Sequence, residues 1–262
     1  MLPLRDHNPS ERVPYVTYAL IVVNVVVFFS YWGQLENYRY IAAFFDSYAF
    51  TPRNLTDDGQ AIGLFTSMYL HGGFMHLAGN MLFLWIFGDN MEEEFGHVGF
   101  FLFYTASGIL ATLAHYLNAP YSDIPLVGAS GAIAGVMGGY LLLFPKAKVD
   151  ILFYFLIFFR IIAVPAWLML GAWFGLQLLN GTGSGDSAGV AYWAHAGGFI
   201  VGFVLTLPIW LKRGATDFWK SSEGHPPHPE AHYRWQESRV PSVRRGQRNG
   251  TRIPIVKRKR DE

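Results

Sequence analysis

The sequence contains no cysteine and is poor in charge. Only 15% of its 262 residues are Asp, Glu, Lys or Arg, whereas an ordinary soluble domain carries about 25%. Without cysteine the chain forms no disulfide and no Cys-ligated metal site. It also lacks the pattern H-E-x-x-H, which is typical of zinc metalloproteases. Hydrophobic residues make up 52% of the chain and aromatic residues 17%, a composition that indicates an integral membrane protein.

The few charges are unevenly distributed along the chain. From Lys212 onward it holds 13 of the 20 Lys and Arg residues but only 6 of the 19 Asp and Glu residues, so residues 1–211 carry −6 and the remainder +7. The segment 212–262 has too little apolar sequence to fold alone, and we expect a mostly disordered basic tail. Beside a membrane such a tail is attracted to anionic lipid, and we expect no nucleic-acid partner.

Six apolar segments are candidates to cross a membrane as helices, which takes about 20 residues with a range of roughly 17–25. They are residues 15–32, 73–87 with the apolar residues just before it, 98–117, 126–144, 161–179 and 191–211. A further apolar stretch, 149–160, is too short to cross separately, and we interpret it as an interfacial or re-entrant lead into the fifth span. We therefore expect an all-α bundle of six transmembrane helices over 15–211, preceded by a short polar lead at 1–14 that lacks a signal-peptide core.

The orientation follows from Lys and Arg in the short loops, which favour the cytoplasmic side. These residues precede the first span and follow the fourth and sixth spans: Arg5, Arg12, Lys146, Lys148, Lys212 and Arg213. With six spans they all lie on one side, so both termini are expected in the cytoplasm. The compact architecture favours a bacterial or archaeal plasma membrane.

Strongly polar residues inside the spans are candidates for function, because they are costly in a membrane. In HGGFMHLAGN, His76 and Asn80 are four residues apart and share one helix face, while His71 precedes the helix. The fourth span contains Ser130 in LVGASGAIAGVMGGY, and the sixth contains His195 in YWAHAGGFIVGF. The spans contain no Asp, which excludes an aspartyl protease, and no acidic residue able to orient His195.

The spacing of small residues predicts that the fourth and sixth spans pack closely. Each helix repeats a small residue every four positions, which lets backbones approach in lipid. These residues are Gly131, Gly135 and Gly139 in one helix and Ala194, Gly198 and Gly202 in the other. Both helices enter from the non-cytoplasmic side, so Ser130 and His195 should lie at similar depth.

Close packing would bring the Ser130 hydroxyl within reach of the His195 imidazole. A neutral histidine suits a general base for an alcohol nucleophile, and His76 and Asn80 could donate hydrogen bonds to an oxyanion beside the Ser130 backbone N–H. Each residue alone also fits a structural role: packing for Ser130, a satisfied buried position for His195, and interhelical hydrogen bonding for His76 and Asn80. Their joint occurrence favours a Ser–His dyad for acyl transfer.

These motifs resemble those of the rhomboid family of intramembrane serine proteases. GASG at 128–131, AHAGG at 194–198 and HGGFMHLAGN at 71–80 occur in the same order as in that family, and the resemblance covers residues 15–211. It implies that Ser130 is the nucleophile and His195 the general base. It further implies residues that position the substrate or oxyanion, and others that give structural support. The positioning set is His76, Asn80 and Gly128, and the supporting set is His71, Glu92, Gly96, Gly131, Gly135 and Gly198.

Two departures from the family pattern bear on the site. Many members place a Tyr four residues after the serine to stack on the histidine, but here that position is Ala134, and the family's WR pair in the first loop is not evident. Taken alone, Glu92, Glu93 and Glu94 fit a solvated helix end, and His115 fits an interfacial position.

The resemblance implies substrates that are membrane proteins with a helix that unwinds near its outer end, cleaved after a small residue. We expect no cofactor and no metal, and the sequence does not indicate an oligomeric state. The alternative is a catalytically inactive rhomboid-like protein that binds client transmembrane helices, although such proteins typically lose the Ser or the His.

Overall fold

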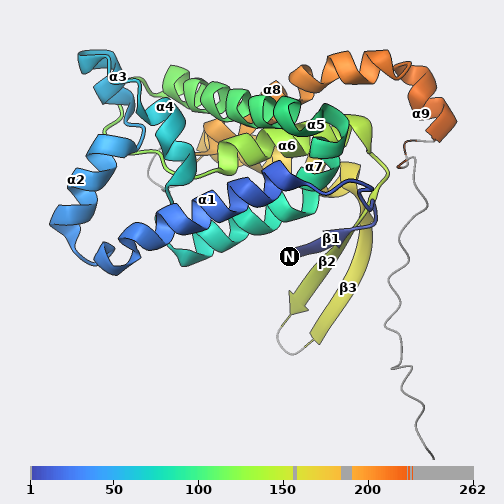
Figure 1. Ribbon diagram of the computed structural model, residues 1–262, viewed down its shortest axis with the longest axis horizontal. Helices are drawn as coiled ribbons and strands as arrows, with labels where there is room; N and C mark the ends of the chain where they lie inside the picture. The colour runs from blue at the N-terminus through green and yellow to red at the C-terminus, as the bar shows by residue number, and fades with distance from the viewer. Residues whose placement is uncertain (1, 156–157, 184–190, 223, 225, 227–262) are drawn as a thin grey trace, which may run out of the picture. The chain divides into compact units, whose positions relative to one another are not determined.

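The computed structural model describes residues 2–155, 158–183, 191–222, 224 and 226, all within the first of two units, Met1–Ala231 (Figure 1). The second unit, His232–Glu262, lies outside the described residues, and with it most of the segment expected to be a disordered tail. In chain order the elements are β1 (Leu2–Asp6), α1 (Tyr15–Tyr31), η1 (Trp32–Gln34), α2 (Tyr38–Tyr48), α3 (Pro52–Asp58), α4 (Gly63–Thr66), η2 (Ser67–Tyr69), α5 (Phe74–Asn118), α6 (Ser130–Leu143), β2 (Lys148–Phe155), β3 (Phe158–Pro165), α7 (Ala166–Gly183), α8 (Tyr192–Lys212) and α9 (Thr216–Ser222).

Three stretches of helix among the described residues are long and apolar enough to cross a membrane: α1 with η1, α5, and α8. Helix α5 is interrupted at Gly96, whose φ of 67° and ψ of 165° are non-helical, and the chain reverses direction there (Figure 1). A positive φ is strained for a residue with a side chain, which is why glycine suits this position. The two halves of α5 correspond to the predicted second and third spans. Helices α6 and α7 correspond to the fourth and fifth, and the total of six crossings stays a prediction.

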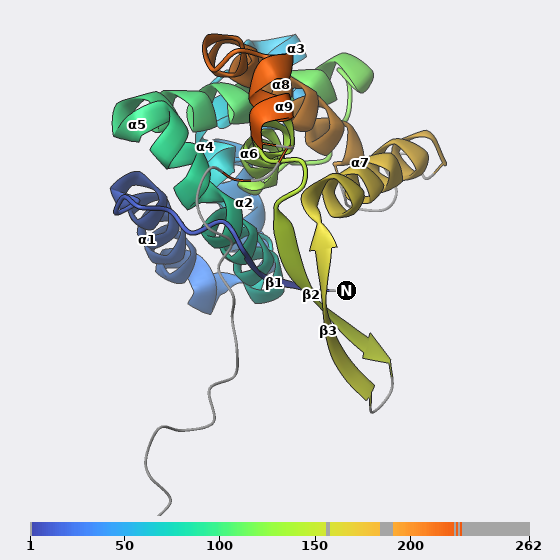
Figure 2. The same cartoon turned by 90° about the vertical axis from the view of Figure 1, so that its right-hand side faces the viewer.

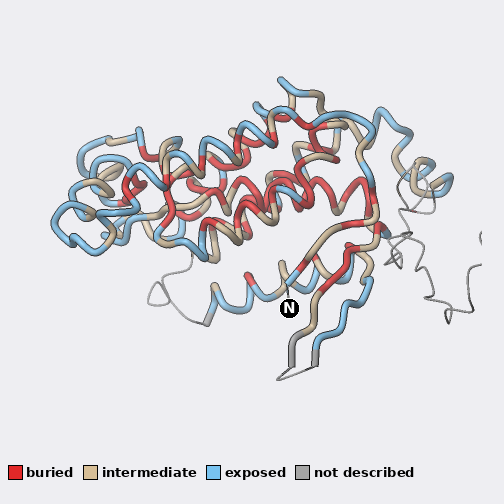
Figure 3. The backbone as a smooth tube through the Cα atoms, turned by 60° about the horizontal axis from the view of Figure 1, so that its bottom comes forward, coloured by how far each residue is buried: buried red, intermediate tan, exposed pale blue. Residues whose placement is uncertain are grey.

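Helix α6 packs against α5 and α8 (Figure 1), and Figure 3 shows that the buried backbone is concentrated in the interior of the helices. Eleven of its 14 residues are buried, as expected of a helix that is apolar or small on every face. The predicted close packing of α6 on α8 is confirmed. A Cβ added at Gly198 would overlap the carbonyl oxygen of Gly131, and one added at Gly202 would overlap that of Gly135. The two backbones are therefore in direct contact beside Ser130 and His195.

The expectation of an all-α chain is wrong after the C-terminal end of α6. Strands β1, β2 and β3 form an antiparallel sheet in that order, and the β2–β3 hairpin projects away from the helices (Figure 2). The β-branched and aromatic residues of this stretch favour strands, and pairing satisfies their backbone groups. Of the segment 149–160, residues 149–155 therefore lie in β2 and 158–160 in β3, and the fifth helix begins at Ala166, five residues later than predicted.

A buried carboxylate joins β1 to β2. Asp150 accepts a hydrogen bond from Arg5 Nε at 2.9 Å, and its other oxygen lies 2.8 Å from His7 Nε2. Burial raises the pKa of Asp150, but the hydrogen bonds and charges of His7 and Arg5 outweigh it and hold that pKa below its usual range. The N-terminal lead is thus tied to the sheet when Asp150 is ionised.

The acidic run at the end of the first half of α5 is not a solvated helix end. Glu92 is 2% exposed and accepts hydrogen bonds from the backbone N–H groups of Val16 and Thr17 at 2.9 and 2.7 Å. These N–H groups belong to the first turn of α1 and have no partner within that helix, so the carboxylate satisfies them and complements the helix dipole. Glu94 forms an ion pair with Arg213 at 2.6 Å.

The chain remains folded for a short distance beyond α8. Helix α9 follows, and the Trp219 indole N–H donates to the backbone oxygen of Leu142 at 3.0 Å while its ring packs on Trp210. The segment 212–262 therefore begins with an ordered helix docked on the end of α6. Residues 227–262, which carry most of the basic charge, lie outside the described residues.

Candidate active site

Ser130 is the first residue of α6, and the loop before it is shaped by Gly128. The φ of Gly128 is +125°, and an added Cβ would lie 2.7 Å from His76 Nε2, so both backbone conformation and space require glycine. The Gly128 N–H donates to the Ser67 backbone oxygen at 2.9 Å, which fixes the loop. The first N–H groups of a helix have no intrahelical partner, so the start of α6 offers donors to an anion.

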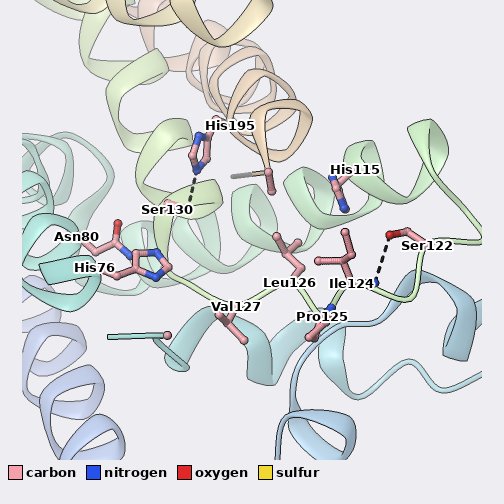
Figure 4. Close-up of a pocket in the computed structure, with 12 residues that line it drawn as sticks. His76, Asn80, His115, Ser122, Ile124, Pro125, Leu126, Val127, Ser130 and His195 are labelled. Carbon is pink, nitrogen blue, oxygen red and sulfur yellow. Dashed lines mark hydrogen bonds between the residues drawn. The ribbon is translucent and has the colours of Figure 1, made fainter. Parts of the chain in front are cut away.

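The structure brings Ser130 and His195 together. Ser130 Oγ and His195 Nε2 are 2.8 Å apart, one on α6 and the other on α8 (Figure 4). The hydroxyl is a donor and a neutral imidazole nitrogen is an acceptor, so this contact suits transfer of the serine proton to the histidine. The sequence positions predicted to pair are thus within hydrogen-bond distance.

The second nitrogen of His195 faces a residue that the sequence analysis missed. His195 Nδ1 lies 2.9 Å from Gln177 Oε1 on α7, and the Trp173 ring lies beside the imidazole with centroids 5.7 Å apart. Gln177 is the one strongly polar residue of the apolar run 166–179. Because such residues are costly inside a membrane, its position alone was a usable signal.

His71, His76 and Asn80 lie together at the start of α5. Asn80 Nδ2 donates to His71 Nε2 at 2.9 Å, and the rings of His71 and His76 are 5.1 Å apart. His71 is held by Tyr31, whose hydroxyl contacts both its backbone N–H and its carbonyl, at 2.7 and 2.9 Å. The cluster presents His76 and Asn80 beside Gly128, two residues before Ser130.

These side chains line a cavity of about 420 Å³. Figure 4 shows His76 and Asn80 on one side, Ser130 and His195 above them, and the loop 122–127 along the opposite wall. His115, which we expected at the interface, also lines this cavity. Among the residues that the structure describes, no group of three or more His, Asp or Glu is placed to hold a metal ion. The cavity thus brings together the Ser130 hydroxyl, the His195 imidazole and further hydrogen-bond donors.

Comparison with known proteins matches the Rhomboid domain family to residues 58–212. The chain is 32% identical over 197 residues to "Rhomboid protease GluP" of Bacillus subtilis, covering 74% of this chain and 36% of that protein. It is also 32% identical over 194 residues to "Rhomboid protein 1, mitochondrial" of Saccharomyces cerevisiae, covering 71% of this chain and 51% of that protein. The chain thus matches about a third to a half of the length of these relatives.

Proposed function

The chain belongs to the rhomboid family and is an integral membrane protein, and from this premise we propose that it is an intramembrane serine protease with Ser130 as nucleophile and His195 as general base. The observation that carries the proposal is the 2.8 Å separation of Ser130 Oγ and His195 Nε2 at the edge of a polar cavity. A structural role would account for the hydrogen bond alone, whereas the protease proposal also accounts for the polar cavity beside it.

The proposed reaction uses the Ser130 hydroxyl as the nucleophile and His195 Nε2 as the base. Ser130 Oγ attacks the carbonyl carbon of the scissile peptide while its proton moves to His195 Nε2, which leaves a tetrahedral oxyanion. The intermediate collapses as the imidazolium gives that proton to the departing amide nitrogen, so the peptide C–N bond breaks and an ester to Ser130 remains. A water molecule then attacks the ester with the same base, releasing the acid and restoring the hydroxyl.

The oxyanion needs donors that are already in place before it forms. The Ser130 backbone N–H lies at the start of α6, where it is not used within the helix. The second Asn80 amide hydrogen remains after its bond to His71, and His76 lies on the same side of the cavity. We assign these three groups to the oxyanion.

The substrates that fit are membrane proteins, cleaved where a transmembrane helix unwinds near the non-cytoplasmic surface. A peptide must leave its helical hydrogen bonds to reach Ser130, and the resemblance to the rhomboid family implies cleavage after a small residue. Family members occur in a bacterium and in yeast mitochondria, so the family does not specify the membrane. A bacterial or archaeal plasma membrane stays our prediction.

The test is covalent labelling with a serine-directed phosphonate probe in detergent, together with cleavage of a model membrane substrate. Ser130→Ala should abolish both while leaving thermal stability nearly unchanged. The matched control is Ser107→Ala, which removes another buried hydroxyl, on the face of α5 that packs on Gly135; it should retain labelling and cleavage. Wild-type cleavage by Ser130→Ala would end the proposal, and loss of both activities in Ser107→Ala would mean that the assay reports folding.

A further inference from the structure

We propose that Gln177 is a positioning residue, which holds His195 in the tautomer and orientation that the reaction requires. This inference rests on the proposed protease function. It concerns the α7 side of the imidazole, for which neither the sequence motifs nor the family match names a residue. Gln177 would act through His195 and would not touch the substrate.

The amide of Gln177 is oriented by a second contact. Its Nε2 donates to the backbone oxygen of Trp173, one turn earlier on α7, at 3.3 Å. An amide nitrogen cannot accept a hydrogen bond, so this contact places the nitrogen toward Trp173 and leaves Oε1 toward His195 Nδ1, 2.9 Å away. The orientation of the amide therefore follows from chemistry, and Gln177 presents an acceptor to the imidazole.

An acceptor at Nδ1 selects one tautomer. A neutral imidazole carries one proton, and the nitrogen that faces a carbonyl oxygen must be the one that holds it. With the proton on Nδ1, Nε2 has a free lone pair, and Nε2 is the nitrogen 2.8 Å from Ser130 Oγ. The other tautomer would place a proton on Nε2 and could not take the serine proton. Gln177 thus favours the form of His195 that acts as a general base.

Gln177 lies on the buried side of α7. Gln177 is 8% exposed, whereas its neighbours Leu176 and Leu179 are 54% and 69% exposed. The same face of α7 carries the buried Leu170, seven residues earlier, and Trp173 between them, so the Gln177 side chain lies on the packing face of the helix. A buried amide is costly without partners, and here each end of the amide has one.

Helix α7 also supplies an aromatic side chain beside His195, which α6 lacks. Many members of the family that this chain resembles have a Tyr four residues after the serine, which stacks on the histidine, whereas this chain has Ala134 there. The Trp173 ring lies 5.7 Å from the His195 ring and tilted by 36°, so an aromatic side chain from α7 covers the imidazole. Trp173 and Gln177, one turn apart, together confine His195 by packing and by a hydrogen bond. The catalytic geometry therefore depends on α7 staying docked on α8.

The first test compares three variants in the full chain by cleavage rate, pH profile and thermal stability. Gln177→Leu removes the acceptor and should lower kcat about tenfold with little change in KM, the scale of one lost hydrogen bond that matters in the transition state. Gln177→Glu keeps an acceptor and adds negative charge beside the imidazole. It should retain more activity than the Leu variant and move the acidic limb of the kcat/KM profile to higher pH, because the charge favours protonated His195.

The matched control is Leu179→Ala, on the exposed side of the same helix, which should leave the pH profile unchanged. A merely structural role for Gln177 predicts changes in thermal stability with no shift of the acidic limb in Gln177→Glu. That result, or a Gln177→Leu variant with wild-type kcat, would overturn the inference.

The second test reads the tautomer directly and does not depend on catalysis. Nitrogen-15 NMR of His195, assigned by its loss in His195→Gln, should show the proton on Nδ1 in a Ser130→Ala background, because Gln177 still selects it. In Ser130→Ala/Gln177→Leu the two tautomers should mix. Absence of Ser130-dependent cleavage with this tautomer pattern intact would refute the protease proposal alone. Ser130-dependent cleavage by the wild-type protein, together with an unchanged tautomer in Ser130→Ala/Gln177→Leu, would refute the role of Gln177 alone.

Discussion

Replacing Gly198 by alanine should damage both the bundle and the catalytic pair. An added Cβ would overlap the carbonyl oxygen of Gly131, the residue directly after Ser130, and Gly198 lies only three residues after His195. A flexible side chain could rotate away, but a backbone oxygen in α6 cannot. Helices α6 and α8 must therefore move apart at the point where they hold Ser130 against His195.

The magnitude follows from two opposing effects. In an open helical position Gly→Ala stabilises by about 1 kcal/mol through helix propensity. Gly171 and Gly175 on α7 have nothing within 4 Å of an added Cβ, so they provide matched controls. At Gly198 the same gain is opposed by over-packing, which costs about 1–3 kcal/mol, so the net loss of stability should be at most about 2 kcal/mol. A shift of about 1 Å in the Ser130–His195 geometry would add a loss of about 10²-fold in rate.

The assay is thermal unfolding in detergent alongside cleavage of a model membrane substrate. Gly198→Ala should unfold at lower temperature and lose most of its activity, while Gly171→Ala and Gly175→Ala should match or exceed the wild-type stability and stay active. The reasoning would be refuted by a Gly198→Ala protein that is as stable and as active as the Gly171→Ala control. It would also be refuted if all three substitutions were equally harmful.

Three further outcomes are expected. Asn80→Ala should lower kcat by roughly 10²–10³, the scale of one lost oxyanion donor, and weaken phosphonate labelling without abolishing it; an unchanged rate would remove Asn80 from the oxyanion site. Because the pKa of Asp150 is depressed in the folded protein, its ionised form contributes stability above the unfolded pKa of about 4 and that contribution is lost as the pH falls through the folded pKa. Asp150→Asn should therefore lower the unfolding temperature at pH 7 and flatten its decline toward low pH, and an unchanged pH dependence would contradict this. Single cysteines at positions 184 and 250, in a chain that has none, should label from opposite sides of the membrane, since labelling from the same side would contradict six spans.

Much of the candidate site could be predicted from the sequence because helix periodicity carries geometric information. A small residue at every fourth position marks the face on which α6 and α8 touch, and Ser130 and His195 are each adjacent in sequence to the first small residue of that face, Gly131 and Ala194. Gly96 likewise marks the break in α5, since its positive φ requires glycine. These features depend on one helix or on one pair of helices, so the local spacing of residues is sufficient to predict them.

Other features depended on contacts between segments far apart in the chain. Strand β2 reads as part of an apolar lead into a helix, because one of its two partners, β1 at residues 2–6, cannot be identified from hydropathy. Glu92 reads as a solvated residue until the first turn of α1 is placed over it, where it satisfies two backbone N–H groups. In each case the stabilising contacts come from a partner segment that lies far away in the sequence.

The sequence by itself determined the chemical groups of this protein and the depth at which each lies in its helix, because apolar length and small-residue spacing follow directly from residue order. Only the tertiary structure decided how α7 is rotated about its own axis. That rotation turns Gln177 toward His195 while Leu176 and Leu179 face outward, and it brings Trp173 over the imidazole. An apolar helix has similar hydropathy on every face, so its rotation is set by the shape of the neighbouring helices and by the two hydrogen bonds of one buried amide.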